Sequence, residues 1–109
     1  MKVVVGFSIF TEEPSAFGSV MGSIEVAASP AVGDAIWFLN PGNGAQMPSC
    51  GFSGVLNVER RSLAANEQDG QLRVSLSDLT VPTTADARAI SEYIERGFGL
   101  FVDVYADAE

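Results

Sequence analysis

The sequence predicts an α+β fold: a small, strongly bent, mainly antiparallel sheet or barrel of about six strands, with one helix before the last strand. Apolar residues occupy every second position in 54–58 and again in 72–76, as in strands with one buried face. The spacing becomes helical in 83–97 and returns to alternation in 98–104. The 109 residues, 1–109, have the size of a single domain, so we expect these elements to share one core.

The first part of the chain predicts three more strands and a long loop. Alternating apolar residues run from 3 to 10 and again from 18 to 27. The run 35–39 is entirely apolar and contains Trp37, which predicts a short strand buried on both sides. Residues 40–54 include two prolines and four glycines and predict a loop, and a loop of this length is often functional or mobile.

The strands around Val58 and Val74 predict a hairpin, because residues 64–70 between them are rich in turn formers. Placing the two valines opposite each other buries both and sets Glu59 against Arg73 on the outer face. In the same register Arg61 lies on the outer face with Arg73, which predicts a small basic cluster.

The buried parity changes after Leu76, because the next apolar residues, Leu79 and Val81, are odd-numbered. A bulge or bend near residues 77–78 would return both side chains to the core. We therefore expect the strand pattern to be interrupted there.

The helix has clear end signals. Thr83 is placed to cap its N-terminus, and Asp86 takes the third helical position, as in a capping box. The buried face is predicted from i, i+3, i+4 and i+7 spacing to consist of Ile90, Tyr93, Ile94 and Gly97. Gly97 also suits the left-handed residue that ends a helix. The strand that follows is expected to pair beside the first strand.

The net charge is −8, from fourteen acidic and six basic residues. This charge repels nucleic-acid phosphates and anionic membrane surfaces, so we expect neither as a partner. No uninterrupted apolar run approaches the ~20 residues that a membrane helix needs. The N-terminus fits a strand better than a signal peptide, and the single cysteine suits a reducing compartment, so the cytoplasm is the default location.

The residue inventory excludes several chemistries. The chain has no histidine, which rules out Ser-His-Asp and Cys-His catalysis within it and the usual zinc ligand sets. It also lacks a cofactor-binding fingerprint, so we predict no cofactor. Asp103, Asp107 and Glu109 share one strand parity, but an acidic terminus in solvent explains them more simply than a metal site, and we predict no metal.

Three classes of function remain open. The preferred one is a non-catalytic acidic interaction protein: an adaptor, an inhibitor or immunity-type partner, or an assembly subunit, with a protein partner or homo-oligomer. Its candidate partner-binding residues are Arg61, Arg73, Asp103, Tyr105 and Asp107. The alternative is a small-molecule-binding barrel in which the 40–54 loop lies near Trp37, with Trp37 and Cys50 as candidate ligand-lining residues. An enzyme that uses carboxylates, a tyrosine or Cys50 is the third and least favoured.

Overall fold

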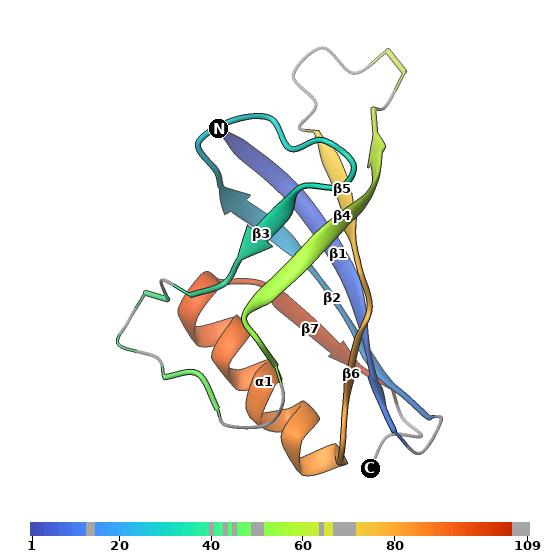
Figure 1. Cartoon of the computed structure of the whole chain (residues 1–109), viewed down its shortest axis with the longest axis vertical. Helices are drawn as coiled ribbons and strands as arrows, with labels where there is room; N and C mark the ends of the chain where they lie inside the picture. The colour runs from blue at the N-terminus through green and yellow to red at the C-terminus, as the bar shows by residue number, and fades with distance from the viewer. Residues whose placement is uncertain are drawn as a thin grey trace.

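The computed structural model describes residues 1–12, 15–39, 41–42, 44, 46–48, 52–63, 65–66 and 72–105. Within them lie seven strands of one sheet and one helix (Figure 1). In chain order the elements are β1 (Lys2–Thr11), β2 (Ser15–Glu25), β3 (Ala35–Trp37), β4 (Val55–Ser62), β5 (Arg73–Leu76), β6 (Leu79–Val81), α1 (Thr84–Phe98) and β7 (Phe101–Val104).

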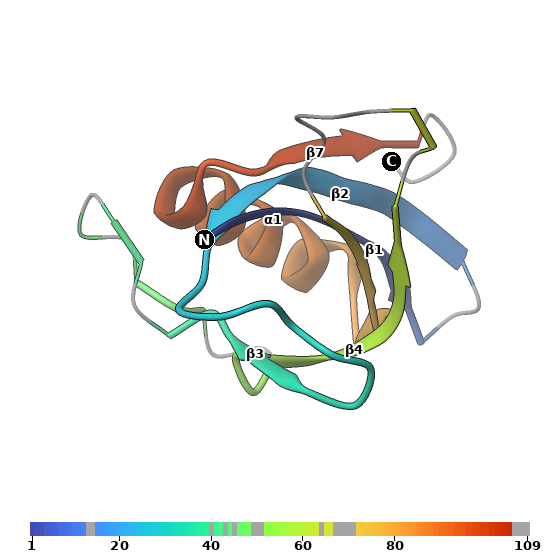
Figure 2. The same ribbon diagram turned by 90° about the horizontal axis from the view of Figure 1, so that it is seen from above.

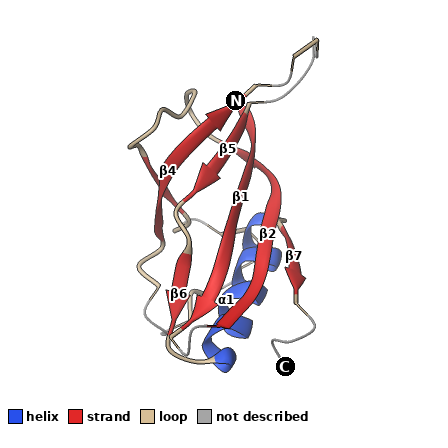
Figure 3. Ribbon diagram, turned by 90° about the vertical axis from the view of Figure 1, so that its right-hand side faces the viewer, coloured by secondary structure: helices blue, strands red, loops and turns tan. Residues whose placement is uncertain are grey.

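The sheet is mixed but mostly antiparallel, with the strand order β3-β4-β5-β1-β2-β7. β5 and β6 both run parallel to β1, one after the other along the same side of it (Figure 3). The sheet curls around α1 without closing into a barrel (Figure 2). The predicted α+β class and the helix before the last strand are therefore confirmed.

The expected pairing of the last strand with the first is wrong. β1 has β5 and β6 on one side and β2 on the other, so neither of its edges is free. β7 instead pairs antiparallel with β2, with Val102 opposite Val20. This places β7 at one end of the strand order and β3 at the other.

The core lies between α1 and the inner face of the sheet. Odd-numbered residues of β1 are buried and even-numbered ones are half-buried or exposed, as the alternation predicted. The helix contributes Ala87, Ile90, Tyr93 and Ile94 to this core. Exclusion of these side chains from water is the main force that holds the helix against the sheet.

The N-terminal cap of α1 is confirmed, whereas the predicted C-terminal glycine is wrong. The Thr83 hydroxyl accepts a hydrogen bond from the Asp86 N–H at 3.1 Å. The helix continues beyond Gly97 and ends at Gly99, which has a φ of 69° and donates its N–H to the Glu95 carbonyl. The extra residues bring Phe98 onto the core, and this packing favours the longer helix.

The register predicted for the hairpin is also wrong. Val58 lies opposite Leu76, and an irregularity between Val58 and Arg60 shifts the pairing that follows. Arg73 therefore faces Ser62 instead of Glu59. The prediction that Val58 pairs with Val74 assumed a regular ladder. The irregularity allows the apolar residues of β4 to point inward although the two strands do not pair residue for residue.

The interruption near residues 77–78 is confirmed, although it is a complete break between two strands. β5 pairs with β1 at Val5, and β6 pairs with it further along at Ile9. Leu79 and Val81 are buried, as their parity required. The Ser77 N–H donates to the Asn57 carbonyl at 2.8 Å, which holds the break against β4.

Candidate functional site

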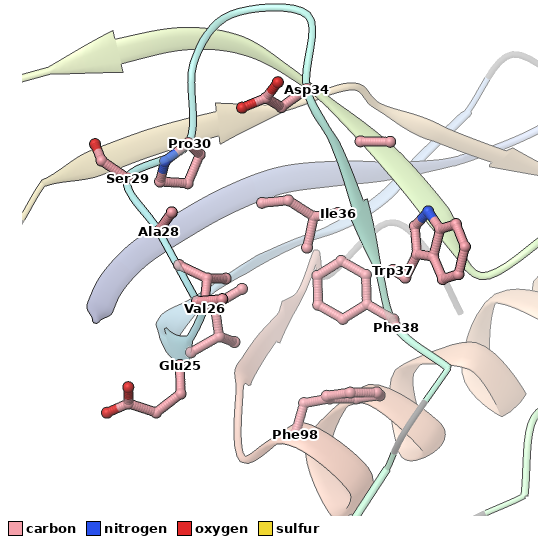
Figure 4. A pocket seen from close by; sticks show the side chains of 13 residues that line it. Glu25, Val26, Ala28, Ser29, Pro30, Asp34, Ile36, Trp37, Phe38 and Phe98 are labelled. Carbon is pink, nitrogen blue, oxygen red and sulfur yellow. The ribbon is translucent and has the colours of Figure 1, made fainter.

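A groove of about 360 Å³ lies on the open side of the sheet, between residues 24–30 and β3 (Figure 4). Its walls come from three parts of the chain: the end of β2 with the segment that follows, β3 with its flanking residues, and the last turn of α1. The lining residues used below are Glu25, Val26, Asp34, Ile36, Phe38 and Phe98. The groove marks the place where the curled sheet remains open.

Four aromatic rings support the floor of this groove. Phe38 packs edge-on against Phe98 with ring centroids 5.1 Å apart, and Phe98 packs against Tyr93 at 5.5 Å. Phe7 of β1 lies 6.3 Å from Phe38 on the inner side. The Tyr93 hydroxyl donates a hydrogen bond to the Phe38 carbonyl, and burial raises the pKa of Tyr93 above its usual value. These contacts fix the end of β3 to the helix.

The backbone of β3 presents one edge to β4 and the other to the groove. The Phe38 N–H donates to the Gly54 carbonyl at 2.6 Å, and the Val58 N–H donates to the Asp34 carbonyl at 2.8 Å. Hydrogen bonds alternate along an antiparallel pair, so the even-numbered residues of this segment are bonded to β4. The N–H and C=O groups of Ala35 and Trp37 therefore point away from β4, and β3 pairs with no other described strand.

Carboxylates and a hydroxyl lie on the rim. Asp34 accepts a hydrogen bond from the Ala31 N–H at 2.7 Å, which closes the turn before β3. Glu25 forms an exposed ion pair with the N-terminal amine at 3.2 Å. Ser29 accepts a hydrogen bond from Arg61 at 3.1 Å. The rim is thus polar and the floor apolar.

The basic cluster predicted on the outer face does not form. Arg61 lies opposite Val74, whose side chain faces the core, while Arg73 lies opposite Ser62 on the other face of the sheet. The shift in β4 separates the two arginines, because one extra residue reverses the direction of the side chains that follow it. Arg61 supports the groove wall through Ser29 instead.

Trp37 is not a core residue, contrary to the expected burial on both sides. Its side chain is 69% exposed, and Figure 4 shows its ring on the side of β3 away from Ile36 and Phe38. An edge strand buries only one face, which the continuous apolar run 35–39 concealed. Trp37 nevertheless belongs to the lining of the groove, because it lies on the edge of β3 that borders it. Cys50 lies outside the described residues.

The other end of the sheet carries two more of the predicted residues. Asp103 and Tyr105 are both exposed, Asp103 opposite Ser19 and Tyr105 bonded through its N–H to the Phe17 carbonyl at 2.9 Å. Asp107 lies outside the described residues.

The sequence prediction omitted Phe101, which is 69% exposed and lies opposite the 60% exposed Met21. Its odd parity, shared with Asp103, was the signal that could have identified it.

The described residues contain no group of three acidic or cysteine side chains placed to hold a metal ion. No helix in the described part of the chain has the length and apolar character required to cross a membrane. The chain matches no protein-family model, and comparisons with curated proteins and with solved structures found no match.

Proposed function

We propose that this protein is a non-catalytic interaction protein that binds an extended segment of a partner protein along the free edge of β3. The observation that carries this proposal is the combination of an unpaired strand edge with an apolar groove beside it. In binding by strand addition, main-chain hydrogen bonds supply affinity, and pockets for alternate side chains supply specificity.

The groove supplies both elements of this binding mode. The partner's backbone would pair with the N–H and C=O groups of Ala35 and Trp37. Every second partner side chain would then enter the groove above Val26, Ile36 and Phe98. We therefore expect an apolar side chain at the partner position over the groove.

Charge indicates which partner would be favoured. The protein carries a net charge of −8, and Glu25 and Asp34 lie at the rim of the groove. A segment with lysine or arginine beside its apolar residue would be steered toward this surface, and an acidic segment would be repelled. The expected partner is an extended segment that alternates apolar and basic residues.

Selection from a library of random linear peptides, displayed against the wild-type protein, tests the proposal. We expect enriched peptides to share an apolar residue flanked by basic ones. The matched variant is Ala35→Pro, which removes an N–H that faces the groove and leaves the even-numbered hydrogen bonds to β4 in place. Ala35→Thr keeps the N–H and serves as the control.

Peptide binding can be followed by the fluorescence of Trp37, the chain's single tryptophan. We expect Ala35→Thr to bind the selected peptides like the wild type and Ala35→Pro to lose them, with both variants folded by circular dichroism. Equal binding by Ala35→Pro, or a selection that enriches no peptides, would contradict the proposal. Val26→Trp gives a second check, because the larger ring fills the groove but leaves the N–H groups of β3 in place, and we expect it to weaken peptide binding.

A small-molecule site is the second candidate, favoured by the volume and apolar floor of the groove. Its volume of about 360 Å³ lies within the usual range for such sites. The same variants separate the two functions. The apolar floor and the carboxylates of Glu25 and Asp34 would suit a small cation with an apolar body. Such a ligand would fill the cavity without pairing with the backbone of β3, so its binding should survive Ala35→Pro and be lost in Val26→Trp.

A further inference from the structure

β7 forms a second free edge, separate from the groove at β3. β7 pairs with β2 and with no other described strand. The Tyr105 N–H is bonded to the Phe17 carbonyl, so the odd-numbered residues of this segment face β2. The N–H and C=O groups of Val102 and Val104 therefore point away from the sheet, available to an added strand.

The outer face of this edge is apolar with one charge at its centre. Phe101, Asp103 and Tyr105 have the same parity and are all exposed. Met21 lies beside Phe101 on β2 and is also exposed. An added strand would place its side chains directly opposite these residues, where opposite charges and aromatic pairs are favourable and like charges are not.

A second copy of the chain fits this edge poorly. In a two-fold antiparallel pairing of β7 with β7 centred on Asp103, Phe101 of each copy lies opposite Tyr105 of the other. The same register sets the two Asp103 carboxylates opposite each other, and both copies carry a net charge of −8. Charged residues on exposed edges commonly prevent self-pairing in this way.

We propose that the β7 edge binds an extended strand of a partner protein with lysine or arginine opposite Asp103 and apolar residues two positions to either side. Asp103 is the residue that determines specificity, because it attracts such a strand and repels a second copy of this chain. Together with the proposed β3 site, this edge would allow one molecule to join two extended partner segments.

A charge-swapped copy of the chain is a suitable probe, because it supplies a strand of known geometry. In Asp103→Lys the central residue is basic and Phe101 and Tyr105 are retained. Each protein should be monomeric alone in sedimentation velocity, and an equal mixture of wild type and Asp103→Lys should form a one-to-one dimer. We expect the mixed dimer to be roughly tenfold tighter than either self-association, from the change of a like-charge pair to an opposite-charge pair.

Two further variants keep the test specific to this edge. Glu95→Lys makes the same change in net charge at an exposed position of α1, which packs on the other face of the sheet from Phe101 and Asp103, and its mixture with wild type should remain monomeric. Phe101→Ser in both chains should weaken the mixed dimer. The proposal is overturned if wild type and Asp103→Lys do not associate, if Glu95→Lys associates equally well, or if Phe101→Ser has no effect. It is also overturned if the wild type self-associates as tightly as the mixture.

Discussion

Tyr93 links the helix to the edge strand of the groove. It is nearly completely buried, and its hydroxyl donates to the carbonyl of Phe38, the residue directly after β3. A short edge strand has few hydrogen bonds of its own, so this contact from α1 is important for its position. Removing the hydroxyl leaves the buried carbonyl without this donor.

Tyr93→Phe is therefore expected to lower the free energy of unfolding by about 1–3 kcal/mol, the usual cost of leaving a buried polar group unpaired. Urea denaturation measures this change. Tyr105→Phe is the matched control, because that side chain is exposed and removal of its hydroxyl should lower the free energy of unfolding by less than about 0.5 kcal/mol. Equal effects of the two substitutions would contradict the role assigned to Tyr93.

The contribution of Tyr93 should also depend on pH. Burial raises the pKa of Tyr93 in the folded protein, whereas the unfolded chain releases this proton near pH 10. A raised pKa in the folded state means that the stabilisation is complete below the unfolded pKa and is lost as the pH rises through the folded pKa. The difference in unfolding free energy between wild type and Tyr93→Phe should thus shrink above about pH 10. A difference that stays constant would exclude this linkage.

At the scale of the elements, the pairing of β7 with β2 depends on the close approach of the β7 backbone to Gly18. A Cβ atom at this position would lie 2.5 Å from the Asp103 carbonyl oxygen and 3.2 Å from the Val104 Cα. Both contacts are with backbone atoms, so relief requires β7 to move. The absence of a side chain at Gly18 allows the two strands to pair in the observed register.

We expect Gly18→Ala to destabilise the fold by about 1–3 kcal/mol, as overpacking usually does. Gly6→Ala is the control, because its Cβ would meet the Val20 carbonyl oxygen at an ordinary 3.6 Å. A strand interior gains about 0.5–1 kcal/mol when alanine replaces glycine, so Gly6→Ala should be neutral or slightly stabilising. Thermal unfolding of both variants checks the contrast, and equal melting temperatures would count against the β2–β7 register.

The edge strand β3 and the β4–β5 pairing show what the periodicity of apolar residues could not predict. A strand at the end of a sheet exposes one face and one backbone edge, and neither property appears in a run such as 35–39, which is apolar at every position. The same limitation affected the hairpin register, because a shift between Val58 and Arg60 leaves no mark in the alternation. Both failures concern relations between strands, which depend on partners distant in sequence.

For the whole molecule, the sequence predicted the fold class and the inner face of most elements. The alternation in β1 and the capped helix were strong signals, because each follows from contacts within one segment. The groove was not predictable, since it joins residues from β2, β3 and the end of α1. Asp103 and Tyr105, proposed from the sequence as candidate partner-binding residues, are exposed, whereas the positions of Arg61 and Trp37 depend on the register shift and on the strand order.

The central claim is that partner segments pair with the free backbone edge of β3. Amide hydrogen exchange of the wild-type protein, alone and with the tightest peptide from the display selection, tests it residue by residue. The account predicts that the peptide slows exchange at the Ala35 and Trp37 amides, while the Phe38 amide, already bonded to Gly54, changes little. Unchanged exchange at Ala35 and Trp37 in the peptide-saturated protein would contradict the account.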